Sequence, residues 1–267
     1  MPVAPRGRAL READAASPVR VGCAGWALPR AVRAEFSGEG SHLQRYASRL
    51  SCAEINSSFY RPHRPDTYAR WAQSVPEDFR FAVKLPRAIT HDARLRGAGA
   101  GLDAFLGQVR GLGAKLGCLL IQLPPSLAFE RGVAARFLGV LRRRHAGAAV
   151  VEARHASWFD AAADALLAGH GIGRVAADPA VVAPAQTPGG DRRVAYFRLH
   201  GSPRMYFSIY SDRFLRRLAR RVEAERAAGA HCWCVFDNTA HGGAVPNALQ
   251  LAALLQRPRR GTVAARR

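Results

Sequence analysis

Eight short apolar runs alternate with segments that mostly have the three-to-four-residue apolar spacing of amphipathic helices. This alternation over residues 19–256 predicts an α/β fold, a TIM-type (β/α)8 barrel. A doubly wound sheet is the alternative, but no Gly-x-Gly-x-x-Gly follows a predicted strand and no Walker loop is present. The expected strands are residues 19–23, 52–56, 79–84, 117–123, 148–151, 172–178, 193–200 and 231–237.

The connecting segments divide into helices and loops. Asp66 is expected to cap a helix that holds Tyr68 and Trp71, and residues 57–60 to continue the second strand. Residues 179–191 are rich in Pro and Gly, so we expect the barrel to be irregular between strands six and seven. The other expected helices are residues 42–49, 102–112, 130–144, 159–168, 212–228 and 246–255.

One barrel domain is expected at residues 19–256, between a flexible N-terminal arm (1–18) and a basic C-terminal tail (257–267). No apolar run approaches the roughly 20 residues that span a bilayer. The arm lacks the apolar stretch of a signal peptide. The 5 cysteines include no C-x-x-C pair, and each falls in a predicted strand, where we expect free, buried thiols. These features predict a cytoplasmic protein without membrane contact.

The formal net charge is +20, and arginine supplies nearly all of the excess because Lys84 and Lys115 are the only lysines. A GC-rich genome would explain arginine in place of lysine, but not 40 basic against 20 acidic residues. A basic surface attracts polyanions without selecting one of them. Nucleic acid is therefore a candidate partner.

Polar side chains stand at the C-terminal ends of all but the first predicted strand, where barrel enzymes build their sites. Residues two apart on a strand share a face, so Glu152 and Arg154 are expected to point the same way. The strand-end residues are Glu54, Lys84, Gln122, Glu152, Asp178, Arg198 and Asp237.

These side chains suggest a division of roles. The carboxylates of Glu152, Asp237 and Glu54 are candidate general acids and bases, and His200 a candidate proton shuttle or metal ligand. Arg154, Arg198 and Lys84 could clamp a phosphate or carboxylate. Further candidate ligand-binding residues are Trp26, Asn56, Tyr60, Gln122, His155, Trp158, Asp178, Tyr206, Tyr210 and Asn238; Phe59 is a further rim aromatic.

A purely structural interpretation is open for the same residues. Buried ion pairs, for instance Glu152 with Arg198, would close the top of a barrel without catalysing any reaction. No compact ligand motif requires a metal, so no cofactor is expected, although carboxylates and imidazole from several strands could form a divalent-metal site.

Several blocks in order resemble the YecE-like family called domain of unknown function 72. They run from Val21-Gly-Cys-Ala-Gly-Trp26 through Glu54-Ile-Asn-Ser-Ser-Phe-Tyr-Arg61, Phe81-Ala-Val-Lys-Leu-Pro86 with Thr90-His91, Gln122-Leu-Pro-Pro125, Glu152-Ala-Arg-His155 and Tyr196-Phe-Arg-Leu-His-Gly201 to Phe236-Asp-Asn-Thr-Ala240. Family members often carry a hydroxyl residue near Cys23-Ala24, which this chain lacks. The resemblance implies a TIM-like barrel over nearly the whole chain and does not imply a particular reaction.

Three functions remain open from the sequence. The first is a hydrolase or lyase acting on a phosphorylated sugar or nucleic-acid component, using carboxylates beside an Arg/Lys clamp. The second is a glycoside hydrolase, although Gln122 and Arg198 or His200 stand where a familiar Glu pairing would be. The third is a non-enzymatic protein that binds nucleic acid or another polyanion. A small-molecule or sugar-phosphate ligand is the expected partner, and the sequence makes no prediction of oligomeric state.

Overall fold

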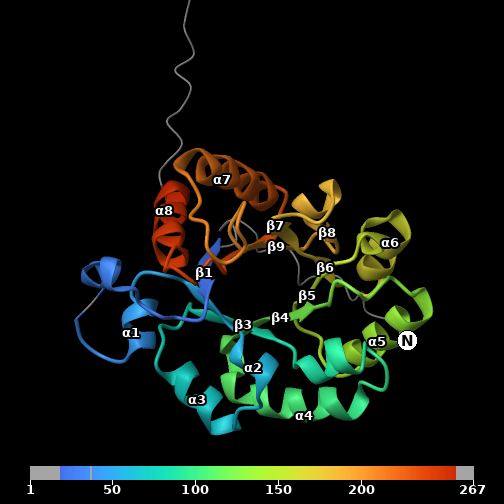
Figure 1. Ribbon diagram of the computed structural model, residues 1–267. Coiled ribbons are helices and arrows are strands. Elements are labelled where there is room, and N and C mark those ends of the chain that lie inside the picture. The colour runs from blue at the N-terminus through green and yellow to red at the C-terminus, as the bar shows by residue number, and fades with distance from the viewer. Residues whose placement is uncertain (1–18, 37, 257–267) are drawn as a thin grey trace, which may run out of the picture.

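The computed structural model describes residues 19–36 and 38–256 (Figure 1). The arm and tail expected at 1–18 and 257–267 lie outside the described residues. All eight predicted strands are present as parallel neighbours around a TIM-type barrel. They are β1 (Arg20–Ala24), β2 (Cys52–Ile55), β3 (Arg80–Lys84), β4 (Leu116–Gln122), β5 (Ala149–Glu152), β6 (Gly173–Arg174) with β7 (Ala176–Asp178), β9 (Val194–Leu199) and β10 (His231–Phe236).

The sixth position of the barrel is a divided strand. β6 pairs with β5, β7 pairs with β9, and Val175 alone separates the two pieces. The link to β9 holds only the 3-10 turn η5 (Ala183–Gln186) and β8 (Gly189–Gly190), which pairs antiparallel with β6. This confirms the predicted irregularity between strands six and seven. The divided strand joins the two ends of the sheet and thereby closes the barrel.

Helices surround the strands on the outside (Figure 1). Seven of them cover or lie near the predicted segments: α1 (His42–Ala47), α3 (Pro65–Gln73), α4 (Gly99–Val109), α5 (Arg131–Arg142), α6 (Ala161–Gly169), α7 (Asp212–Ala227) and α8 (Ala244–Gln256). Shorter turns are η1 (Arg30–Glu35), η2 (Ala88–Asp92), η3 (Arg110–Lys115) and η4 (Ala156–Phe159). Among the described residues, no helix is both long and apolar enough to cross a membrane.

Two local predictions were wrong. Residues 57–60 form the short helix α2 (Ser57–Tyr60) rather than an extension of β2, because Ser58 donates hydrogen bonds to the carbonyls of Ile55 and Lys84. Asp66 is not the cap of α3. Arg64 occupies the N-cap and Pro65 the first helical position, where its missing N–H costs nothing, and this places Asp66 inside the first turn.

The strands line the barrel with two kinds of side chain. An apolar layer includes Cys52, Ala82, Cys118, Leu120, Val150, Val175, Tyr196, Trp233 and Val235. Two residues further along their strands come Glu54, Lys84, Gln122, Glu152, Arg198 and Asp237. Because successive side chains alternate between faces, these polar residues point to the same side as the apolar layer. The polar layer therefore lies at the C-terminal mouth of the barrel.

All five cysteines are free and buried in strands, as the sequence predicts. Burial raises the pKa of the Cys23 and Cys232 thiols to about 12. Thiolates, not thiols, are the reactive species, so these side chains act as small apolar residues of the core.

Candidate functional site

Arg198 is the centre of the polar layer at the mouth. Its guanidinium lies 2.6 Å from a Glu54 carboxylate oxygen, 2.9 Å from one of Glu152 and 3.0 Å from one of Asp237. Tyr196, two residues before Arg198 on β9 and deeper in the barrel, donates a 2.7 Å hydrogen bond to Glu54. One arginine thus joins carboxylates from three different strands, and the predicted ion pair between Glu152 and Arg198 is present.

His200 lies between two of these carboxylates. Its Nε2 is 2.7 Å from Glu152 Oε1 and its Nδ1 is 3.1 Å from Asp237 Oδ2. Arg154 also contacts Glu152 at 3.0 Å, so Glu152 and Arg154 share a face as expected, and Gln122 donates to the second Glu152 oxygen at 2.8 Å. The chain Glu152–His200–Asp237 can pass a proton between two carboxylates.

Glu152 and Asp237 stay ionised within this network. Burial on its own would raise the pKa of Glu152, but Arg198, His200 and Arg154 together hold it well below the usual range. Burial would also raise the pKa of Asp237, and Arg198 and His200 lower it. Neither group is therefore a protonated acid at neutral pH.

Lys84 is charged, buried and unpaired. It is 7% exposed, and its ammonium lies 4.0 Å from the centroid of the Phe59 ring, a cation–π contact. Within residues 19–36 and 38–256 it has no ion pair or side-chain hydrogen bond. Burial, followed by the nearby charge of Arg198, lowers the pKa of Lys84 to about 8. At pH 7 roughly a tenth of this amine is therefore neutral, far more than of a lysine with the ordinary pKa of 10.5.

Several residues near the mouth were not among the predicted site residues. His91 lies 4.9 Å from the Phe59 ring; burial and the charges of Lys84, Arg87 and Arg154 lower its pKa. It stands in the Thr90-His91 block, so a signal was available. Ser57 Oγ lies 2.7 Å from His63 Nε2 across the short helix α2, a pairing that no sequence spacing indicates.

A 350 Å³ cavity opens beside the ends of β1 and β2. Trp26, Glu54, Asn56 and Ser57 line it, and the buried Oδ1 of Asn56 has no hydrogen-bond partner in the described structure. An amide oxygen without a partner is costly to bury, so a ligand with a donor would be stabilised here. Trp26 itself packs edge-on against Trp71 at 5.1 Å.

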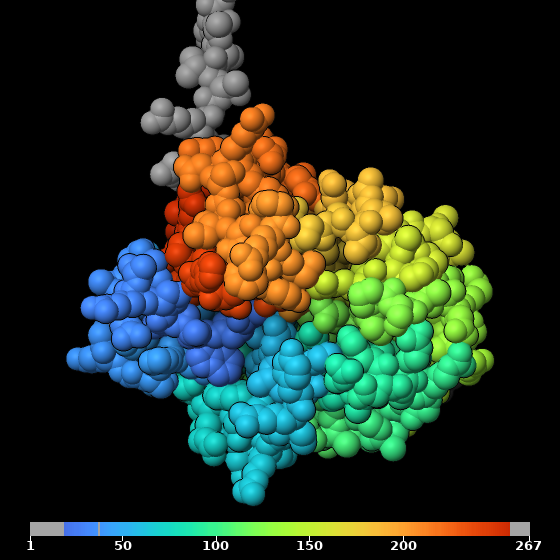
Figure 2. All heavy atoms as spheres, in the orientation of Figure 1, coloured from blue at the N-terminus to red at the C-terminus, as the bar shows by residue number. Residues whose placement is uncertain are grey.

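The predicted aromatic rim is only partly present. Tyr60 is 79% exposed and Tyr206, at 40%, lies edge-on to His200 at 5.9 Å. Tyr206 has φ +69°, a left-handed conformation rare for a bulky residue. Trp158, by contrast, is buried and donates to the Leu127 carbonyl. In Figure 2 the orange segment between β9 and α8 covers part of the centre of the face that is turned toward the viewer.

Four other expected binding residues do not join the mouth cluster. His155 contacts Ser157 at 2.8 Å, and Asn238 donates to the Ser208 carbonyl, supporting the loop after β9. Asp178 accepts a 2.8 Å hydrogen bond from Tyr210, and both line a cavity against α7, outside the barrel. The side chain of Asp178 faces outward because Val175 faces inward and the strand alternates.

No group of three His, Cys, Asp or Glu side chains with the arrangement of a metal site occurs in residues 19–36 and 38–256. The carboxylates at the mouth instead face guanidinium and imidazole groups.

The fold and this polar layer define a TIM-type barrel protein with a buried ion-pair network at the C-terminal ends of its strands. Comparison of the sequence gives the family: the chain belongs to the family described as protein of unknown function DUF72, whose profile matches residues 20–267.

Curated relatives are UPF0759 protein YecE of Escherichia coli strain K12 and of Escherichia coli O157:H7, each 31% identical over 106 residues. The aligned segment covers 40% of this chain and 38% of each relative, so it spans about two fifths of their length. A DUF72 family protein from Enterococcus faecalis V583 has a similar fold, with a TM-score of 0.76, 21% identity, and 90% and 96% of the two chains covered. A DUF72 family protein from Thermotoga maritima MSB8 has a TM-score of 0.74 and 25% identity, with 90% of this chain and 99% of that chain covered.

Proposed function

We propose that the protein is a lyase that acts on a phosphorylated sugar at the barrel mouth, with the Lys84 amine as nucleophile. The observation that carries this proposal is the contrast between Lys84 and every other charge there. Lys84 is buried, has a pKa of about 8 and faces no carboxylate within ion-pair distance in the described residues. A desolvated lysine of this kind is the group that forms imines with carbonyl substrates.

The chemistry follows from the neutral amine. Its lone pair attacks the carbonyl carbon of the sugar, and the carbonyl oxygen leaves as water, giving a protonated imine. That cation accepts the electron pair of the bond between the α and β carbons as this bond breaks, while the β-hydroxyl loses its proton and becomes the carbonyl of the departing fragment. The enamine left on Lys84 takes a proton at its α carbon, and hydrolysis of the resulting imine returns the free amine and the second carbonyl fragment. The Glu152–His200–Asp237 chain supports the necessary proton transfers.

The phosphate would lie against Arg154, the cation that the network leaves accessible. Among the described residues Arg154 Nη1 contacts only the Met205 sulfur, at 3.7 Å. His91, near Lys84 and Arg154, has a lowered pKa and would offer the phosphate a neutral imidazole. A guanidinium with a free N–H edge is well suited to a phosphate oxygen.

The glycoside hydrolase alternative is less well supported. Such enzymes need one carboxylic acid with a raised pKa to protonate the leaving group. Lowered pKa values at Glu152 and Asp237 favour carboxylates instead.

Reductive trapping tests the proposal. The protein is incubated with glyceraldehyde 3-phosphate or ribose 5-phosphate and borohydride, and the adduct is located by intact and peptide mass spectrometry. Since Lys84 and Lys115 are the only lysines, Lys115→Arg is a matched control. We expect an adduct on Lys84 in the wild type and in Lys115→Arg, and none in Lys84→Arg. An adduct on Lys115, or none on Lys84 with either sugar, would refute the imine mechanism.

A further inference from the structure

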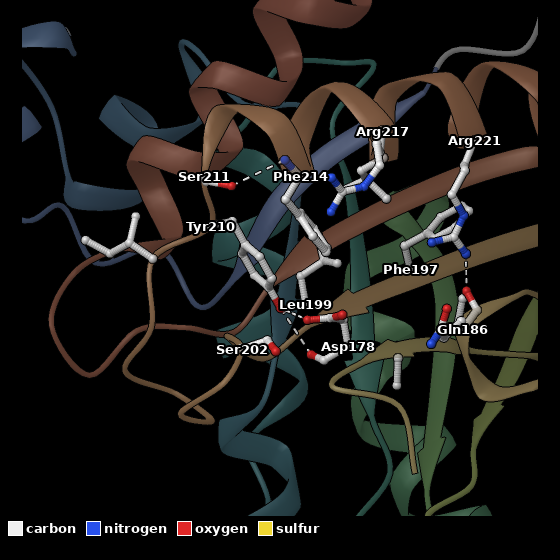
Figure 3. Close-up of a pocket in the computed structure, with 14 residues that line it drawn as sticks. Asp178, Gln186, Phe197, Leu199, Ser202, Tyr210, Ser211, Phe214, Arg217 and Arg221 are labelled. Atoms are coloured by element: carbon white, nitrogen blue, oxygen red, sulfur yellow. Dashed lines mark hydrogen bonds between the residues drawn. The ribbon is translucent and has the colours of Figure 1, made fainter. Parts of the chain in front are cut away.

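The outer surface of the barrel is incompletely covered next to its divided strand. A regular (β/α)8 barrel would place a helix between the sixth and seventh strands, but η5 and β8 take its place here. A cavity of about 510 Å³ remains against the outer faces of β7 and β9, with α7 along one side (Figure 3). Its volume is typical of small-molecule pockets.

Apolar side chains form the floor of this cavity, and polar groups make up most of its accessible lining. Ala176 and Leu199 contribute from the strands, Phe197 from the middle of β9, and Phe214 and Leu218 from α7. Phe214 stacks on Tyr210 with ring centroids 4.3 Å apart, which gives one wall a flat aromatic surface. Such a floor suits the ring or short chain of an organic molecule.

Two arginines from α7 extend over this floor, one helical turn apart (Figure 3). Arg221 donates a hydrogen bond to the Gln186 carbonyl and lies 5.5 Å from the Phe197 ring. Arg217 is exposed; in the part of the chain that the structure describes its side chain has no hydrogen bond or ion pair, only a 5.9 Å cation–π contact with Phe214. Its donors are free to bind an anion.

Among the described residues that line the cavity, one carboxylate is present, and it is already engaged. Asp178 accepts the phenolic hydrogen of Tyr210 at 2.8 Å. Burial, followed by the charge of Asp178, raises the pKa of Tyr210, so the phenol keeps its proton. Two guanidinium groups against one hydrogen-bonded carboxylate leave the cavity with an excess of positive charge.

We propose that this cavity is a second binding site, separate from the barrel mouth, for a small amphipathic organic anion. The apolar body of the ligand lies on Phe214 and Ile209, above the buried Phe197 and Leu199, and its carboxylate, sulfonate or phosphate pairs with Arg217. Binding requires both contacts: Arg217 supplies the charge-assisted hydrogen bond, and the apolar side chains supply the hydrophobic contact.

The test uses benzenesulfonate as the probe, which is neither a sugar nor a carbonyl compound. Methanesulfonate keeps its charge without the ring, and benzyl alcohol keeps the ring without the charge. Ligand-detected NMR titrations of the wild-type protein are expected to show benzenesulfonate binding about tenfold more tightly than either fragment. Equal affinity for methanesulfonate would overturn the proposal, because simple charge attraction would then suffice.

Matched variants locate the site. Arg217→Gln should weaken benzenesulfonate binding about fivefold or more, since it removes the cation that pairs with the sulfonate. Arg220→Gln removes the same charge from the same helix but does not line the cavity, so binding should persist. Binding should also persist in Lys84→Met, which removes the unpaired ammonium group of the barrel mouth. Unchanged binding in Arg217→Gln, or loss in Lys84→Met, would overturn the proposal.

Discussion

Each of two sides of the barrel mouth holds a buried cation, Arg198 on one and Lys84 on the other, and the partners of these two cations differ. On one side Arg198 contacts Glu54, Glu152 and Asp237 within 3.0 Å, and every member has partners. On the other, the side chain of Lys84 has only the ring of Phe59 as a partner within residues 19–36 and 38–256. A closed network holds strands together and needs no ligand, whereas a buried cation without an anion is a site that a ligand can complete.

The chemistry of the two cations fits this difference. Arginine presents a rigid fork of donors, keeps its charge when buried and can bridge several carboxylates. Lysine loses its proton readily when desolvated, as the lowered pKa of Lys84 shows. The structural interpretation therefore applies to Arg198 and its carboxylates, and the proposed function depends on Lys84.

Breaking the closed side should have the largest effect on stability. Arg198→Met leaves three carboxylates in a buried layer without their common cation, and we expect the free energy of unfolding to fall by about 3–5 kcal/mol. Urea-induced unfolding at pH 7 measures this. Arg136→Met, at an exposed position of α5, is the control and should change stability by less than about 0.5 kcal/mol. Similar values for both variants would contradict the network's structural role.

Acid should reduce the difference in the free energy of unfolding between the wild type and Arg198→Met. The pKa values of Glu152 and Asp237 lie below their ordinary values of 4.5 and 3.8 in the folded protein. Their contribution is therefore complete above these values and is lost as the pH falls toward the folded pKa. A gap that stays constant from pH 7 down to about 3 would show that the carboxylates are not stabilised by Arg198.

Removing the unpaired charge should have a smaller effect of opposite sign. Lys84→Met deletes a cation that folding desolvates, so we expect a gain on the order of 2 kcal/mol at pH 7. Between pH 8 and 10.5 the unfolded chain holds a proton on Lys84 that the folded chain has released, so wild-type stability rises and the gap narrows. Unfolding from pH 7 to 10.5 measures this, with Lys115→Met as control. Parallel curves for the wild type and Lys84→Met would contradict it.

The exposed rim should matter least for stability. Tyr60 is 79% exposed, so Tyr60→Ser should change the free energy of unfolding by less than about 0.5 kcal/mol. A larger loss, measured by the same urea titration, would mean that Tyr60 supports Phe59, whose ring lies 4.9 Å away, and through it Lys84.

The sequence predicts the barrel and its polar layer because both depend on local periodicity. Alternation along β5 and β9 is sufficient to place Glu152 and Arg198 at one end of the strands. It is not sufficient to show that Asp178 faces outward, because that depends on Val175, which divides the sixth strand and fixes which residues point inward. Which cation remains unpaired depends on distances across the barrel, and these distances cannot be derived from the spacing of residues along the chain.

The buried thiols have a practical consequence. Because Cys23, Cys52, Cys118, Cys232 and Cys234 are all withdrawn from solvent, a maleimide reagent meets no competing native group on the folded protein. A cysteine introduced at the exposed position 60 would be the single reactive handle for a fluorophore or spin label. Motion of the chain around the barrel mouth could then be followed spectroscopically in otherwise native protein.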